Sequence, residues 1–211
     1  MNAPRHHPTE EDLFAYATGT ANEAVAVLVA CHLTFCPACR AEVAAIEAVG
    51  AALGPGPAPV PPVLPSAEAL LARAAPEARP DPVTADEVFP APLRERVGPA
   101  AGLPWRRLPM GVAHAAIELQ GGHCFLYDFP AGLVLPSHHH QGLERAMPLT
   151  GGFTDDEGTF GVGDVSLKAG HRSHQVRIDE GERCVCLFVN DGAIVPDNLA
   201  LRLAAKLSGL S

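Results

Sequence analysis

Hydrophobic residues recur at intervals of three and four over roughly the first fifty positions, which is the spacing of amphipathic helices. Thr9, followed by three acidic residues, is typical of a helix start because its hydroxyl oxygen can accept from a free amide of the first turn. We expect this helix to end near Gly19. Asn22 predicts the start of a second helix and Cys36-Pro37 the start of a third, since proline suits the first helical position.

The composition then changes. The stretch "GPGPAPVPPVLP" at 54–65 is too rich in proline and glycine for regular structure and predicts an extended spacer. A short helix is expected over 66–75, and a second Pro-rich tract follows it. The predicted organisation is a helical domain over residues 1–78, a Pro-rich linker over 79–103, and a second domain over 104–211.

In the second half the hydrophobic period shifts towards two. The runs "HAAIEL", "HCFLYDF", "VSLKAG" and "RCVCLFV" alternate as strands do, and Gly, Pro, Asp and Asn separate them. Short strands without intervening helices favour an antiparallel sandwich or barrel. A final segment, "PDNLALRLAAKL", is predicted to be helical. The fold class is therefore α plus all-β in two domains.

Composition narrows the choice of partner and compartment. The 211 residues carry a formal charge of -9, which disfavours nucleic acid and anionic membranes as direct partners. No apolar run approaches the roughly 20 residues that a membrane helix needs, and the N-terminus has no apolar signal core. We therefore expect a cytoplasmic protein whose cysteines are reduced and serve as metal ligands, redox sensors or core residues.

The stretch "ACHLTFCPAC" at 30–39 is the first candidate for a metal site. His32 is expected at the end of the second helix, while Cys36 and Cys39 lie one turn apart at the start of the third. Thiolate and imidazole are the ligands that zinc prefers. A fourth ligand has to come from elsewhere, and His6 and His7 before the first helix are the natural source. The alternative is that both thiols are small core residues and His32 is a buried polar residue.

These residues carry a family resemblance. "HLTFCPAC", preceded by "RHHPTEEDLFAYATGT", resembles the zinc-binding domain of the ChrR-type anti-sigma factors. In that family, helices held by zinc bind an extracytoplasmic-function (ECF) sigma factor and keep it from RNA polymerase. The resemblance implies Zn²⁺ bound by His7, His32, Cys36 and Cys39, with His6 able to substitute for His7. It also implies that the partner is an ECF-type sigma factor.

A second motif lies a hundred residues later. The stretch "SHHHQGLE" at 137–144 has the histidine and glutamate spacing of the first cupin motif. The second half therefore resembles the cupins, which are jelly-roll barrels also called double-stranded β-helices. On a strand, His138 and His140 alternate to the same face, and Glu144 returns from the neighbouring strand. The second cupin motif begins at Gly163 and places its histidine at His174. This site is expected to hold a divalent metal, for which zinc is favoured and manganese, iron and nickel stay open.

Some positions near this motif depart from the pattern or have two interpretations. Pro148 falls where a barrel strand should run, although proline is tolerated at edges and bulges. Ala169, His171 and Ile178 replace the usual residues of the second motif. His139 and His171 are not expected to be ligands. Cys184 and Cys186 alternate to one strand face, where they are either core residues, which we favour, or redox-active; Cys31 and Cys124 are assigned to the core.

The resemblance predicts a transcriptional regulator rather than an enzyme. The helical domain would sequester the sigma factor, and the cupin would sense singlet oxygen or related oxidants and promote release. The alternative is a cupin metalloenzyme, dioxygenase- or isomerase-like, with an appended zinc module. A zinc-dependent DNA-binding domain is disfavoured because residues 1–53 contain two arginines against six acidic residues.

Overall fold

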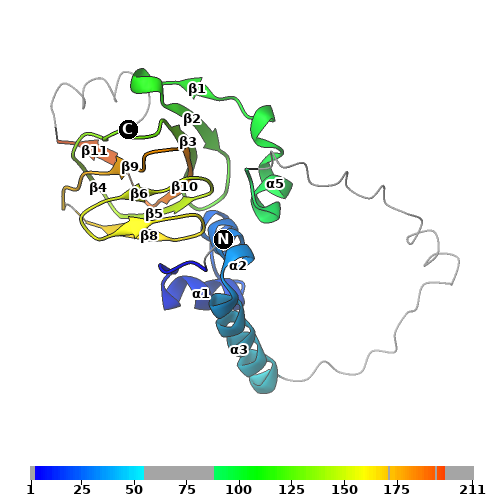
Figure 1. Ribbon diagram of the computed structural model, residues 1–211. Coiled ribbons are helices and arrows are strands. Elements are labelled where there is room, and N and C mark those ends of the chain that lie inside the picture. Colours follow the sequence, from blue (N-terminus) through cyan, green and yellow to red (C-terminus); the bar gives the residue numbers. More distant parts are fainter. Residues whose placement is uncertain (1–2, 55–87, 171, 193, 198–211) are drawn as a thin grey trace, which may run out of the picture.

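The computed structural model describes most of the two predicted domains (Figure 1). The described residues are 3–54, 88–170, 172–192 and 194–197. The predicted helix at 66–75, the first part of the predicted linker, His171 and most of the predicted C-terminal helix lie outside them.

Three helices form where the sequence predicts them: α1 (Glu10–Ala17), α2 (Glu23–Phe35) and α3 (Pro37–Leu53). The side chains of Thr9 and Asn22 cap α1 and α2 by accepting from backbone amides of the first turn. Cys36 ends α2 and begins α3, and a proline occupies the start of α3. Among the described residues, no helix combines the length and apolar character needed to span a membrane.

The linker prediction has to be corrected for the part that the structure describes. Residues 88–103 include helix α5 (Ala91–Val97), which packs against α2. Leu93 is fully buried and Phe89 nearly so. The sequence did not predict this helix, because its high proline content is typical of a linker and its apolar run is too short to show periodicity. The helix can form because proline is compatible with a first helical turn.

All paired strands described in the second half are antiparallel, which confirms the predicted cupin-like fold class. The main sheet has six strands in the order β1-β2-β3-β10-β5-β8. Two smaller sheets, β11-β4 and β7-β6-β9, complete the barrel-like domain. The strand bounds are β1 Arg106–Arg107, β2 Ala113–Ile117, β3 His123–Phe129, β4 His138–His140, β5 Leu143–Pro148, β6 Phe153–Thr154, β7 Thr159–Phe160, β8 Ser166–Ala169, β9 Arg177–Ile178, β10 Cys184–Asn190 and β11 Ile194–Pro196.

Pro148 does not interrupt the barrel. It is the last residue of β5 and pairs with Cys186 of β10, and its carbonyl accepts from the amide of Gly163. A proline at a strand end removes one donor at a place where the ladder is ending.

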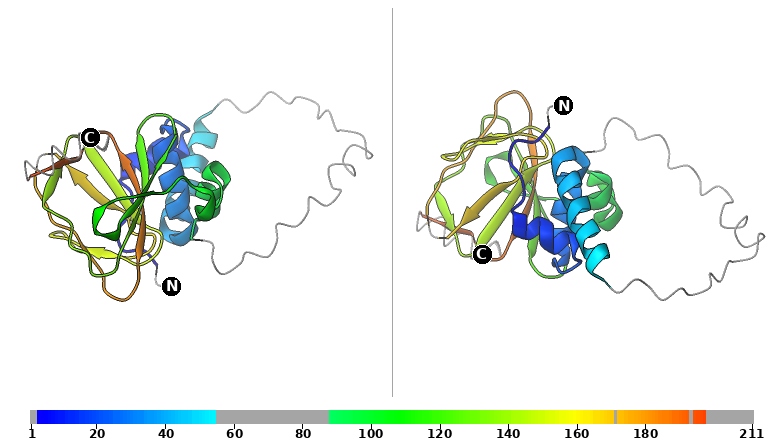
Figure 2. Two further views of the ribbon diagram at one scale, coloured as in Figure 1. Left: turned by 90° about the horizontal axis from the view of Figure 1, so that it is seen from above. Right: turned by 90° about the horizontal axis from the view of Figure 1, so that it is seen from below.

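The helices and the main sheet share one hydrophobic core. Figure 2 shows α1, α2 and α3 together on one side of the β-domain. Leu28 of α2, Leu126 of β3 and Leu187 of β10 are fully buried and belong to the same apolar cluster. The two predicted domains are therefore packed together, and a change in one can reach the other through direct contact.

Candidate functional site

The first candidate site lies where α2 meets α3. Its members are His7, His32, Cys36 and Cys39, whose ligand atoms all lie within 4.8 Å of one another. His32 Nε2 is 3.3 Å from Cys39 Sγ, and His7 Nδ1 is 3.5 and 3.4 Å from the sulfurs of Cys36 and Cys39. Ligands of a tetrahedral zinc ion lie about 3.3–3.8 Å apart. These four residues are compatible with zinc binding.

Local structure positions each member of this group. His32 is in the last turn of α2, Cys36 caps α3, and the amide of Cys39 donates to Cys36 Sγ. His7 precedes α1 and is the exposed member, whereas the other three are buried. The ring of His6 packs instead against Phe160 at a centroid distance of 4.4 Å. The structure therefore brings His7 rather than His6 to the cluster.

Burial shapes the protonation of this group. It raises the pKa of the Cys39 thiol to about 12, with the neighbouring Cys36 adding to the effect. It also lowers the pKa of His32 below the usual value. In the metal-free protein Cys39 is thus a thiol, and a metal that binds there has to displace its proton.

The second candidate site lies inside the β-domain. His138, His140 and His174 have ligand atoms within 4.8 Å of one another, and the Nε2 atoms of His140 and His174 are 2.9 Å apart. His138 and His174 also pair through their backbones, each amide donating to the other carbonyl. Burial, followed by the neighbouring histidines, lowers the pKa of His140 to about 3. Three imidazoles facing one another suit a divalent metal.

Glu144, the fourth predicted ligand, is placed differently from the three histidines. Its Oε2 lies 3.2 Å from His140 Nδ1, and the carboxyl is not in the group whose ligand atoms converge. Burial raises its pKa to about 8. The structure thus places the Glu144 carboxyl beside His140 Nδ1, whereas the His140 nitrogen that faces His174 is Nε2. His139 contacts Asp197 instead of joining the group.

Two buried charged groups were not predicted from the sequence. Lys168 Nζ lies 2.8 Å from Asp155 Oδ2 and 2.6 Å from Glu157 Oε2, next to His174. Arg145 of β5 makes a two-point contact with Asp12 of α1, at 2.8 and 3.0 Å. Charged residues far apart in sequence resemble ordinary surface residues. The one signal in the sequence is the acidic turn that contains Asp155 and Glu157, which precedes the strand of Lys168.

The four remaining cysteines are all buried and free. Cys31 and Cys124 belong to the core shared by helices and sheet, whereas Cys184 and Cys186 belong to a second cluster inside the barrel. Burial raises the pKa of Cys186 well above its usual value. These positions agree with the predicted packing role.

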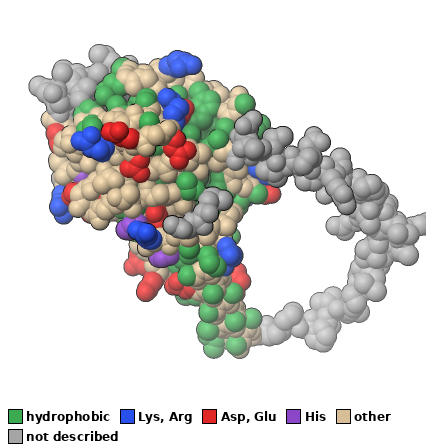
Figure 3. Space-filling model, in the orientation of Figure 1, with side chains coloured by type: hydrophobic (Ala, Val, Ile, Leu, Met, Phe, Trp, Pro, Cys, Tyr) green, Lys and Arg blue, Asp and Glu red, His purple; other side chains and the backbone are tan. Residues whose placement is uncertain are grey.

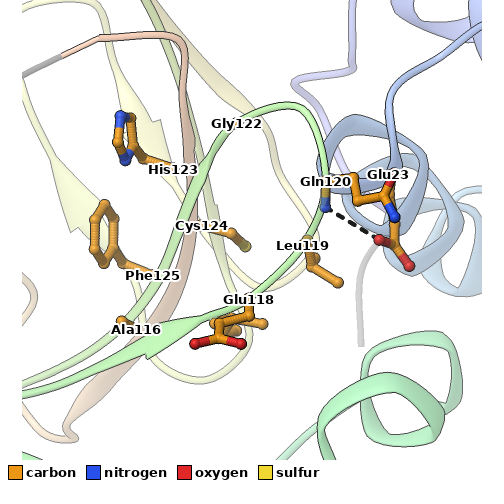
Figure 4. A pocket seen from close by; sticks show the side chains of 10 residues that line it. Glu23, Ala116, Glu118, Leu119, Gln120, Gly122, His123, Cys124 and Phe125 are labelled. Atoms are coloured by element: carbon orange, nitrogen blue, oxygen red, sulfur yellow. Dashed lines mark hydrogen bonds between the residues drawn. The ribbon is translucent and has the colours of Figure 1, made fainter.

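Two of the cavities formed by the described residues differ sharply in size. The one beside His138, Glu144 and His174 has a volume of about 30 Å³, enough for one water molecule or ion. A more open one of about 470 Å³ lies beside the β2–β3 turn (Figure 4). There the amide of Gln120 donates to Glu23 of α2, which also pairs with Arg96. Among the described residues, no group of His, Cys, Asp and Glu side chains that could hold a metal ion lines this second cavity.

Known proteins are similar to this chain in sequence and in fold. The family model described as the ChrR cupin-like domain matches residues 94–195. The anti-sigma-E factor ChrR of Cereibacter sphaeroides is 36% identical over 200 residues, which cover 90% of this chain and 91% of that protein. The crystal structure of Rhodobacter sphaeroides SigE in complex with the anti-sigma ChrR aligns with a TM-score of 0.71 at 35% identity, covering 90% of this chain and 100% of that chain. The chain belongs to the ChrR family of anti-sigma factors.

Proposed function

We propose that this protein is a cytoplasmic, zinc-dependent anti-sigma factor that binds an ECF-type sigma factor and withholds it from RNA polymerase core. The observation that carries this proposal is the convergence of His7, His32, Cys36 and Cys39 where α1, α2 and α3 meet, in a chain similar over nearly its whole length to an anti-sigma factor. Zinc supplies four bonds at this junction and fixes the relative placement of the helices.

The surface of α3 supports a protein partner. Its C-terminal end projects from the body of the molecule and is largely apolar (Figures 1 and 3). Val49 and Leu53 are 59% and 81% exposed, while Glu42 and Glu47 are exposed on the same helix. Exposed apolar residues rimmed by acidic ones suit a basic partner with an apolar contact surface.

The proposal assigns sensing to the β-domain. Its ligands would be His138, His140 and His174, with Glu144 joining them once a divalent metal, preferably zinc, draws its carboxylate from His140. By family resemblance the signal is singlet oxygen or a related oxidant, and the response is release of the sigma factor. Release requires that the signal favour a state with lower affinity for the partner.

The size of the barrel cavity argues against the enzyme alternative. Substrate pockets usually enclose about 300–1,000 Å³, whereas the cavity beside His138, Glu144 and His174 encloses about 30 Å³. A metal there can meet a water-sized molecule such as an oxidant. A larger substrate would require the barrel to open.

Co-purification with the ECF-type sigma factor of the same organism tests the proposed function. Zinc-loaded full-length protein should form a stable complex on size-exclusion chromatography. The double variant Cys36→Ser/Cys39→Ser should lose it, because two of four ligands are gone. Cys184→Ser, buried in the barrel, is the matched control and should keep it. A wild-type protein that carries zinc but forms no complex would contradict the proposal.

A further inference from the structure

A short loop of the β-domain contacts the first candidate site, which lies in the helical domain. Residues 161–165 connect β7 to β8, and three of them contact either His32 or the segment that precedes His7. Contacts that orient metal ligands are part of a metal site even when they belong to another domain.

The first contact is made by Gly163. Its carbonyl oxygen lies 2.7 Å from His32 Nδ1 and accepts a hydrogen bond from the N–H of that nitrogen. The bond leaves His32 Nε2 unprotonated and directed towards Cys39, 3.3 Å away. Gly163 has φ +84, and a Cβ on it would lie 2.8 Å from atoms of Phe35. Only glycine lets this loop approach α2 so closely.

The second contact is made by Asp164, whose side chain is buried. Its Oδ1 accepts from the amides of Arg5 and His6 at 2.6 and 2.9 Å, and its Oδ2 accepts from the amide of Gly161. The amide of Val165 donates to the carbonyl of His6 at 3.1 Å. These bonds hold the backbone immediately before His7.

His7 depends on such support more than the other three residues do. It is exposed, and residues 3–9 form neither helix nor strand. His32, Cys36 and Cys39 are held by two helices, whereas His7 has its position fixed by the following cap of α1 and by loop 161–165. Removing the loop contacts would free the backbone on one side of His7.

We propose that residues 163–165 of the β-domain orient His7 and His32. The metal affinity of the helical domain then depends on whether this loop is docked against the helices. The inference rests on the proposed metal site at His7, His32, Cys36 and Cys39. Because coupling is reciprocal, metal binding at the helices also favours the docked position of the loop. A signal that displaces the loop therefore weakens metal binding in the helical domain, which is the part proposed to bind the sigma factor.

Cobalt(II) titration of the full chain tests this inference. Tetrahedral cobalt bound to thiolate gives a ligand-to-metal charge-transfer band, and the histidines and Glu144 of the barrel have no thiolate. The band therefore reports on the helical site alone. Zinc affinity follows from displacement of the bound cobalt.

Asp164→Ala should weaken metal binding by about 10- to 100-fold, the usual effect of losing an outer-shell contact. Asp164→Asn keeps the shape but loses the charge-assisted bonds, and should weaken it about fivefold. Asp128→Ala, which removes a β-domain aspartate paired with Arg183, is the control and should stay within twofold of wild type.

The outcomes separate the inference from the proposed site. Wild-type affinity in Asp164→Ala, or equal losses in Asp164→Ala and Asp128→Ala, would overturn the inference while leaving the metal site intact. If Asp164→Ala does not fold, Asp164→Asn decides, and an unchanged affinity there overturns the inference. A wild-type protein without the charge-transfer band refutes the proposed site itself, and with it the inference.

Discussion

The buried ion pair between α1 and the β-domain allows a quantitative prediction about how the domains are joined. Asp12 and Arg145 side chains are each only 8% exposed, and the guanidinium meets the carboxylate at two points. Asp191 also lies 3.4 Å from Arg145, but its side chain is 43% exposed. Arg145 thus has a second partner that water can reach, whereas Arg145 is the only side-chain partner of Asp12 among the described contacts.

This asymmetry sets the expected magnitudes. Arg145→Met leaves the Asp12 carboxylate buried without a partner, which should lower the free energy of unfolding by about 3–5 kcal/mol. Asp12→Leu leaves Arg145 with Asp191 and should cost less, about 1–3 kcal/mol. The double variant replaces the pair with apolar groups and should lie within about 1 kcal/mol of wild type. The coupling energy of the cycle is then about 3 kcal/mol or more.

Urea unfolding, followed through the fluorescence of Trp105 at saturating zinc, provides the assay. With a urea slope of roughly 2–3 kcal/mol/M for a chain of this size, Arg145→Met should lower the midpoint by about 1–2 M. Arg183→Met is the matched control, because its partner Asp128 lies in a half-exposed pair and its loss should cost under about 1 kcal/mol. Single-variant costs that add in the double variant would refute the reasoning.

Three further predictions concern the metal site and the buried groups. Zinc affinity should rise at least about tenfold per unit between pH 6 and pH 8, because Cys39, with a pKa raised to about 12, must lose a proton on binding; a flat profile in chelator competition would contradict this. Lys168→Met should cost about 3–5 kcal/mol in urea unfolding, because the fully buried Asp155 side chain loses its lysine partner and keeps the two backbone amides that donate to its Oδ1; a neutral result would show that these amides are enough to hold the buried carboxylate. Leu93→Ala should cost about 2–5 kcal/mol, since Leu93 is the fully buried residue of α5, which packs against α2; a loss below about 1 kcal/mol would mean that α5 is not part of the cooperative core.

Local patterns were enough to predict that three members of the first candidate site lie together. His32, Cys36 and Cys39 fall within eight residues, and the helix end and start that bring them together carry their own sequence signals. The strands followed from alternation, since β3 and β10 coincide closely with the predicted runs. His138, His140 and His174 converge as the spacing of the two cupin motifs predicted.

The contacts between the two halves could not be predicted in this way. Asp12 and Arg145 are 133 positions apart, and Asp164 lies 158 positions from His6. Isolated charged residues of this kind look like surface residues in a sequence, and only the fold shows that they are buried. The Pro-rich composition pointed to independent domains, whereas apolar residues of α2, β3 and β10 pack into one shared cluster.

The spacing of the motif also could not predict the direction of the Glu144 side chain. The motif fixed its strand and its neighbours, but the direction of a carboxylate depends on the charges around it. Burial favours the protonated form of Glu144, and its carboxyl lies beside His140.

The most direct test of the central claim is competition for the sigma factor between this protein and RNA polymerase core. Zinc-loaded full-length protein, added in stoichiometric amounts to labelled ECF-type sigma factor, should prevent its assembly with core, and the Cys36→Ser/Cys39→Ser variant should not. If the sigma factor binds core equally well with and without the zinc-loaded protein, the chain does not act by withholding it, and the account is contradicted.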